Sequence, residues 1–182
     1  MNEIELIRGC QNLDGTAQHT LFQVYAGKLM TICRRYAGDR HEAEDMLQES
    51  FIKIFKYINQ YKSLGSFEGW IRRITVNTAI EVLQKRKIRF TEIKNVPYES
   101  ESIDNSVLSD LDAEDLLKVI SQLPDGYRAV FNLFVLEGYS HEEIAKMMKI
   151  EAATSRSQLS KARAMLREKI NSLQKIRVNN DR

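Results

Sequence analysis

The chain has 182 residues, a hydrophobic fraction of 43% and a formal net charge of +2, values that are typical of a globular protein with one or two small domains. Only two prolines and eight glycines interrupt it, so long helices are expected. No apolar run approaches the ~20 residues that a membrane-spanning helix needs, and the start does not resemble a signal peptide. Composition therefore excludes a wholly disordered chain and direct membrane insertion, and it predicts a cytoplasmic protein.

Three amphipathic helices are expected in the first half. Apolar residues recur at helical spacing over residues 21–36 and 43–58, and a third helix is predicted from about residue 66 to residue 87. The polar segment 61–66 predicts a loop before the third helix. With a short helix ahead of them, these helices can close one core.

The sequence changes character after Arg89. Residues 91–110 are rich in Ser, Asn, Glu and Asp and have no sustained period, which predicts a flexible acidic linker. Helical periodicity returns before Pro124 and again after it. The predicted fold is all-α, with small helical domains at residues 1–90 and 111–182 joined by the linker at 91–110.

A helix-turn-helix is predicted in the C-terminal domain. Ser140 and Glu143 form the sequence pattern of a capping box, a short helix follows, and a break at residues 149–151 precedes a longer basic helix. Leu159, Ala162 and Leu166 have the spacing to face the core. The second helix would enter a DNA major groove, and its candidate contacts are Arg156, Ser157, Ser160 and Lys161. The alternative is a helical hairpin with a solvated basic face.

The helix at 43–58 carries a second stripe beside its apolar one. It consists of Asp45, Gln48, Glu49 and Ile52. An acidic patch that ends in an apolar residue suits an interface with a basic helical partner. An ordinary solvated face is the alternative.

The third helix and the loop before it contain candidate nucleic-acid contacts. One predicted polar side of this helix, at spacings of three and four, carries Arg73, Asn77, Ile80, Gln84 and Lys87. Asparagine there could read base edges, and the basic residues could hold phosphates. The loop at 61–67 offers aromatic, hydroxyl and backbone groups for an unstacked base. The candidates in this region are Lys62, Ser63, Phe67, Arg73 and Asn77.

Catalytic and metal motifs are missing from the sequence. His41 and His141 each begin a string like the zinc motif HExxH, but neither has a histidine four residues later, so both are expected to be surface histidines. Cys10 and Cys33 lack the spacing of a zinc site and are expected to be reduced thiols in a core. We therefore expect no enzyme, no metal and no cofactor.

Two stretches resemble the extracytoplasmic-function group of sigma factors, the smallest members of the sigma-70 family. Residues 43–51 (AEDMLQESF) are similar to the family's core-binding helix, residues 67–79 (FEGWIRRITVNTA) to its promoter-melting helix, and residues 123–167 to its upstream-element domain. The resemblance implies a subunit that binds RNA polymerase core and directs promoter recognition, strand opening and transcription initiation.

The resemblance also implies a role for each candidate surface. The stripe from Asp45 to Ile52 would meet the clamp helices of the largest polymerase subunit, and the flap is a further expected contact. The loop and Asn77 would handle the minus-ten element, and the basic helix from Arg156 to Lys161 the minus-thirty-five element. An anti-sigma protein is a reasonable further partner. A stand-alone helix-turn-helix regulator is the competing hypothesis.

Four positions depart from the family's pattern. Lys149 stands where a glycine is frequent at the turn, and Glu151 where serine or threonine often caps the recognition helix. Glu81 replaces a common aspartate and Val76 a frequent arginine. A left-handed conformation at Lys149 would cost roughly 1 kcal/mol.

Overall fold

Every regular element in the described part of the chain is a helix. The computed structural model describes residues 2–85 and 113–180. The elements are α1 (Glu3–Gln11), α2 (Gly15–Tyr36), α3 (Arg40–Tyr57), the 3-10 turn η1 (Ile58–Gln60), α4 (Phe67–Lys85), α6 (Ala113–Ser121), α7 (Asp125–Phe131), the π-helical turn η2 (Asn132–Leu136), α8 (His141–Met148) and α9 (Ala152–Asn180). The all-α prediction is confirmed, and the predicted linker at 91–110 lies outside the described residues.

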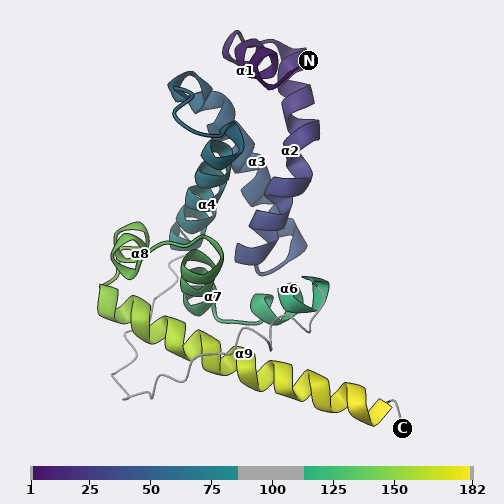
Figure 1. The fold of residues 1–182 in the computed structure, drawn as a ribbon, viewed down its shortest axis with the longest axis vertical. Helices are drawn as coiled ribbons and strands as arrows, with labels where there is room; N and C mark the ends of the chain where they lie inside the picture. The colour runs from purple at the N-terminus through teal and green to yellow at the C-terminus, as the bar shows by residue number, and fades with distance from the viewer. Residues whose placement is uncertain (1, 86–112, 181–182) are drawn as a thin grey trace. The chain divides into compact units, whose positions relative to one another are not determined.

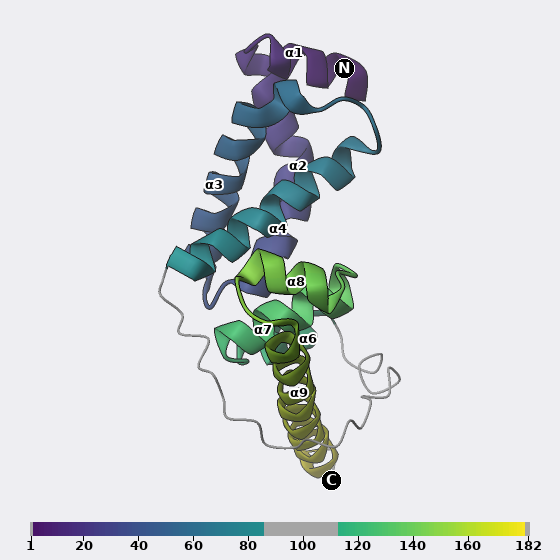
Figure 2. The same ribbon diagram turned by 90° about the vertical axis from the view of Figure 1, so that its left-hand side faces the viewer.

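The chain divides into two compact units, Met1–Val82 and Leu83–Arg182. In the first unit, α2, α3 and α4 lie side by side, and α1 lies across the start of α2 (Figure 1 and Figure 2). This bundle presents both α3 and α4, the two helices that carry predicted contacts, from one packed core.

Side-chain caps determine where the helices of the first unit begin. Asn2 and Glu5 form a capping box at α1. The Asp14 carboxylate accepts a hydrogen bond from the Thr16 amide at 2.8 Å, and Asp39 accepts one from the Glu42 amide at 2.9 Å. A carboxylate at these positions satisfies amide groups that lack an intrahelical partner. As a result, α2 begins at Gly15 and α3 at Arg40, ahead of the apolar patterns at 21–36 and 43–58 that predicted them.

The core of the first unit is built from the apolar stripes of α2, α3 and α4. Its fully buried side chains include Leu21, Leu29, Cys33, Tyr36, Ala43, Met46, Ile54 and Ile71. Phe22, one of the apolar residues of the predicted 21–36 helix that were expected on its buried side, is instead 43% exposed and packs against the ring of Phe51 with centroids 4.7 Å apart.

Both cysteines are buried and unpaired, as predicted. Burial raises the pKa of the Cys33 thiol to about 12 and also raises the pKa of Cys10. Both side chains are therefore neutral thiols at pH 7, which suits their place among apolar neighbours.

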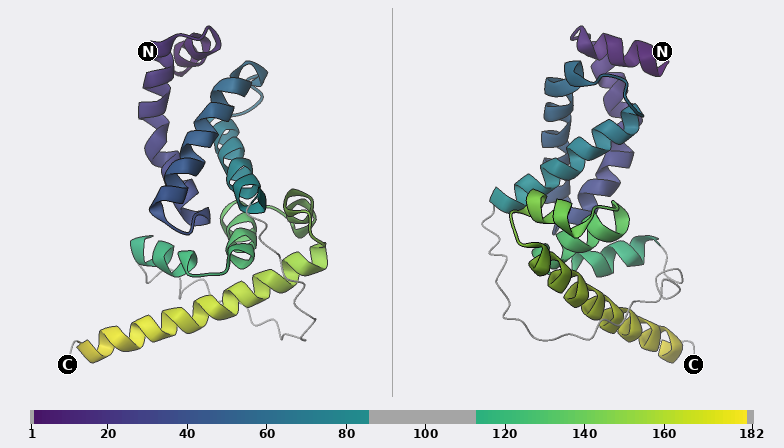
Figure 3. Two further views of the ribbon diagram at one scale, coloured as in Figure 1. Left: turned by 180° about the vertical axis from the view of Figure 1, so that it is seen from behind. Right: turned by 60° about the vertical axis from the view of Figure 1, so that its left-hand side comes forward.

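In the second unit, α6, α7 and α8 all pack against α9, the long helix that Figure 3 shows from two sides. The turn between α6 and α7 surrounds Arg128, whose side chain is 2% exposed. Arg128 Nη1 donates to the carbonyl oxygens of Ser121 and Leu123 at 2.8 and 3.2 Å, and Nη2 pairs with Asp125 Oδ1 at 2.5 Å. One buried guanidinium thus holds the α6–α7 turn together.

Lys149 ends α8 in the left-handed backbone conformation whose cost was considered above, with φ 56° and ψ 45°. The next amide, that of Ile150, donates to the Ala145 carbonyl at 3.1 Å and closes the turn. A lysine Cβ is crowded in this region of backbone space, whereas glycine is not.

Replacing Lys149 with glycine is expected to stabilise the second unit by about 1 kcal/mol, because it relieves this crowding. The matched control is Lys146→Gly, an exposed position inside α8, where glycine should destabilise by about 1 kcal/mol. Urea denaturation followed by circular dichroism measures both. If the two substitutions shift stability in the same direction, the strain at Lys149 is negligible.

Candidate functional site

The acidic stripe of α3 lies on the surface of the first unit. Asp45 and Gln48 are exposed, the Glu49 side chain is 40% exposed, and Ile52 is 54% exposed. Each of these residues lies three or four positions from two of the others along α3, so the four share one face. An exposed isoleucine beside carboxylates is an arrangement that suits a protein partner better than water alone.

The loop before α4 has a defined shape. Tyr61 Oη donates to the Gly65 carbonyl at 2.6 Å, and Ser63 and Gly65 adopt positive φ values of 56° and 146°. Between these residues, Leu64 is 90% exposed, and Lys62 and Ser63 are exposed as well. The hydrogen bond closes the base of the loop and leaves its tip available for a ligand.

Phe67 departs from its predicted role as a DNA contact, because its side chain is fully buried. Its ring packs edge-on against Tyr25 and Tyr61 and stacks with Trp70, with centroids 5.2 to 5.8 Å apart. Phe67 thus supports the loop from beneath and offers no surface to a base.

The polar face of α4 contains Arg73 and Asn77, both exposed and one helical turn apart. Ile80 was predicted to share this face, and that prediction was wrong, since Ile80 is 3% exposed and continues the buried stripe of Val76. One arginine and one asparagine therefore remain as the outward-pointing candidates of this helix.

The helix-turn-helix geometry is present in α8 and α9. Ser140 and Glu143 form the predicted capping box, with the Glu143 amide donating to Ser140 Oγ at 3.2 Å and the Ser140 amide donating to Glu143 Oε2 at 2.8 Å. On α9 the three residues predicted to face the core are buried. They are Leu159, Ala162 and Leu166.

The candidate DNA contacts lie on the accessible side of α9. The Arg156 side chain is 56% exposed, and Ser157, Ser160 and Lys161 are half-buried. Arg156 Nη1 also pairs with Glu142 Oε1 on α8 at 3.5 Å. This exposed pair is weak, so it orients the guanidinium without preventing a contact with a base or a phosphate.

His141 was predicted to be a surface histidine, and the structure corrects this. It is half-buried, it stacks on Phe134 with centroids 4.5 Å apart, and its Nδ1 lies 2.9 Å from the buried Ser155 Oγ. Burial and the nearby Arg156 lower its pKa, so the ring is neutral at pH 7. His141 therefore fixes α8 against α9, a role that sequence spacing did not indicate.

The described residues contain neither a candidate metal site nor a candidate membrane span. Within residues 2–85 and 113–180, no group of three His, Cys, Asp or Glu side chains is placed to hold a metal ion. None of the helices in that part of the chain is long and apolar enough to cross a membrane.

Comparison with known proteins identifies the family. The family model for sigma-70 region 2 matches residues 21–88, and that for sigma-70 region 4 matches residues 113–166. The ECF RNA polymerase sigma factor SigE of Mycolicibacterium smegmatis is 31% identical over 81% of this chain, which spans 59% of that relative's length. The ECF RNA polymerase sigma-E factor of Haemophilus influenzae is 30% identical over 92% of this chain and 95% of its own length.

A solved structure shares the fold. The sigma factor RpoE from Bartonella quintana, determined in complex with the anti-sigma factor NepR, superposes with a TM-score of 0.51 and 22% identity, covering 82% of this chain and 94% of that one. Together with the sequence matches, these findings define the class. The chain belongs to the extracytoplasmic-function RNA polymerase sigma factors of the sigma-70 family, and it is an initiation factor, not an enzyme.

Proposed function

We propose that this sigma factor binds polymerase core through the acidic stripe of α3, opens the minus-ten element with α4 and the preceding loop, and reads the minus-thirty-five element with α9. The observation that carries the proposal is that one chain exposes two unlike surfaces. An acidic face with Ile52 lies on α3, and Arg156 lies on the second helix of a helix-turn-helix. The first suits a basic protein partner and the second suits DNA.

The minus-ten surface is proposed to consist of Lys62, Ser63, Arg73 and Asn77, with Phe67 as its buried support. In this arrangement the loop holds a base that has left the stack, and Arg73 holds the backbone. The functional division is proposed to follow residues 1–90, 91–110 and 111–182. The polymerase flap and an anti-sigma protein are proposed as further partners, and the cytoplasm as the site of action.

Run-off transcription on a genomic fragment library tests the proposal. Purified core polymerase with this chain should produce promoter-specific transcripts that core alone does not produce. The competing hypothesis, a stand-alone helix-turn-helix regulator, requires the chain to footprint DNA without polymerase. A footprint by the free chain together with absent run-off products would support that regulator and overturn the proposal.

Replacing Arg156 with alanine is expected to cost about 1 to 3 kcal/mol of specific binding and to relax base preference at one upstream position, because arginine donates two hydrogen bonds to guanine. Lys161→Ala should instead weaken binding to all sequences alike and reduce the salt dependence. Transcription from a randomised minus-thirty-five library measures both effects. If base preference changes with Lys161→Ala and survives Arg156→Ala, the two roles are reversed.

A further inference from the structure

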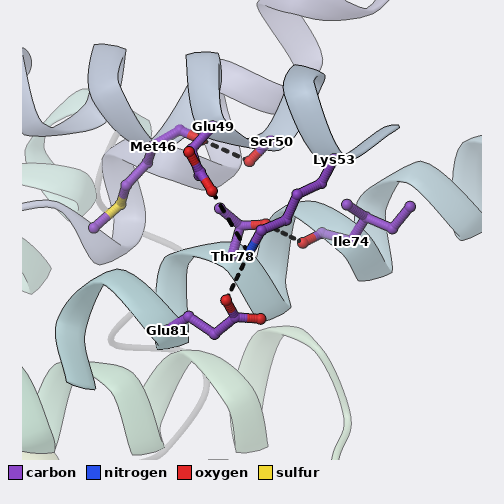
Figure 4. Close-up of polar contacts among 7 residues, drawn as sticks. All are labelled: Met46, Glu49, Ser50, Lys53, Ile74, Thr78 and Glu81. Atoms are coloured by element: carbon purple, nitrogen blue, oxygen red, sulfur yellow. Dashed lines mark hydrogen bonds and ion pairs between the residues drawn. The ribbon is translucent and has the colours of Figure 1, made fainter. Parts of the chain in front are cut away.

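Lys53 on α3 lies between two carboxylates that belong to different helices. Its Nζ is 2.6 Å from Glu81 Oε2 on α4 and 4.0 Å from Glu49 Oε1, one turn earlier on α3 (Figure 4). The Lys53 side chain is 18% exposed, whereas the side chains of Glu49 and Glu81 are 40% and 53% exposed. One ammonium group is thus shared unequally between two carboxylates.

The pair between Lys53 and Glu81 differs from the hydroxyl contacts drawn beside it in Figure 4, because those stay within one helix. Ser50 Oγ donates to the Met46 carbonyl at 2.6 Å, and Thr78 Oγ1 donates to the Ile74 carbonyl at 2.8 Å. Both hydroxyls are buried and bond to their own helix. Of the contacts in this view, the pair between Lys53 and Glu81 is the one that joins α3 to α4.

The two carboxylates lie beside the two proposed functional faces. Glu49 is part of the α3 stripe proposed to bind polymerase. Glu81 lies one helical turn beyond Asn77 and therefore on the same side of α4. Glu81 is also one of the positions where this chain departs from the family's pattern, and its carboxylate reaches Lys53.

We propose that Lys53 is a positioning residue that couples polymerase binding to promoter opening, an inference that rests on the proposed function of the α3 stripe. When a basic group of the polymerase engages Glu49, Lys53 loses its more distant carboxylate. Its charge then acts on Glu81 alone and holds α4, with Asn77, in the orientation that opens DNA. Such a coupling must act in both directions, so weakening the Lys53 contacts changes core binding as well as opening.

The key variant is Lys53→Met, which keeps the length of the side chain and removes its charge. It should bind core about twofold more tightly, because Glu49 no longer has a competing cation on its own helix. It should open promoters about fivefold more slowly, the upper range for a pair of this exposure. Fluorescence titration with core measures the affinity, and permanganate reactivity over time measures opening.

Companion variants separate positioning from general stability. Glu81→Gln should show the same loss of opening and bind core about twofold more weakly, because Lys53 then has Glu49 as its remaining carboxylate and competes with the partner for it. The double variant should open no more slowly than either single one. Lys53→Arg should restore most of the opening rate. Circular dichroism should give the parent signal throughout.

The matched control is Lys28→Met. Lys28 Nζ pairs with Glu68 Oε2 at 2.6 Å and joins α2 to the first turn of α4. Neither residue of this pair belongs to α3, the helix that carries the acidic stripe. This variant should keep the parent affinity and the parent opening rate. An equal loss of opening in Lys28→Met and Lys53→Met would overturn the proposal, because any ion pair onto α4 would then have the same effect.

An Asp45→Lys variant in the same assays separates a failure of the Lys53 coupling from a failure of the proposed polymerase interface. If Asp45→Lys loses core affinity while Lys53→Met opens promoters at the parent rate, the coupling is wrong and the proposed interface stands. If Asp45→Lys binds core like the parent, the proposed interface fails, and the coupling fails with it.

Discussion

Replacing Arg128 with methionine is expected to destabilise the second unit by about 2 to 4 kcal/mol. Methionine occupies a similar volume but donates no hydrogen bond. The substitution therefore leaves the carbonyl groups of Ser121 and Leu123 without the donor they have now, and it leaves Asp125 without its cation. Since the free energy of unfolding of a whole domain is only about 5 to 15 kcal/mol, this change removes a large part of it.

Two probes on the full-length chain can locate the Arg128 effect. Trp70, the one tryptophan of the sequence, lies in the first unit, so its fluorescence transition should not move. Amide hydrogen exchange in α7 and α9 should accelerate. Lys118→Met breaks a pair with the half-buried Asp115 on α6 in which the lysine itself is exposed, and it should change stability by less than about 1 kcal/mol. Equal effects of the two variants would mean that the buried guanidinium contributes no more than a surface charge.

Reversing both charges of the α3 stripe, with Asp45→Lys and Glu49→Lys together, is expected to weaken core binding at least tenfold, or by about 1.4 kcal/mol. Both side chains reach solvent, and the proposed partner surface is basic, so attraction becomes repulsion. The fold should survive because neither residue belongs to the core. Affinity for purified core polymerase is the measurement, with circular dichroism as the test of folding.

Glu44→Lys provides the control for the charge reversal. Glu44 is an exposed carboxylate next to Asp45 in sequence, about 100° from it around α3, and it pairs with Arg40 at 2.8 Å. Its reversal should leave core affinity within about twofold, since exposed pairs contribute little. If the double variant binds core as well as Glu44→Lys does, the interface lies elsewhere on the molecule.

Much of the fold could be predicted because the residues that form and cap a helix lie close together in the sequence. The period of apolar residues identified α2, α3, α4 and α9, and the Ser140 and Glu143 pair identified the start of α8. The starts of α2 and α3 were predicted too late because polar first turns, such as the one capped by Asp14, carry no apolar period. The left-handed turn at Lys149 was raised as a condition by the family resemblance, in which glycine is frequent at this position, and the structure shows that turn.

The candidate site was predictable to the extent that its residues needed only to be exposed on one helix face. Asp45, Asn77 and Arg156 meet that condition. Phe67 and Ile80 do not, because other helices or the loop cover them. A single sequence shows which side chains share a face but not which of two faces is covered.

By itself, the sequence determined the helices, the capping box of α8, the helix-turn-helix and the family resemblance, and each of these depends on short stretches of sequence. Only the tertiary structure decided the burial of Phe67, the packing of His141 on Phe134 beside Ser155, and the pairing of Lys53 with Glu81 across 28 positions of sequence. The reason is physical: the 3.6-residue period sets the direction of each side chain about its own helix, whereas its partner is set by how neighbouring helices pack.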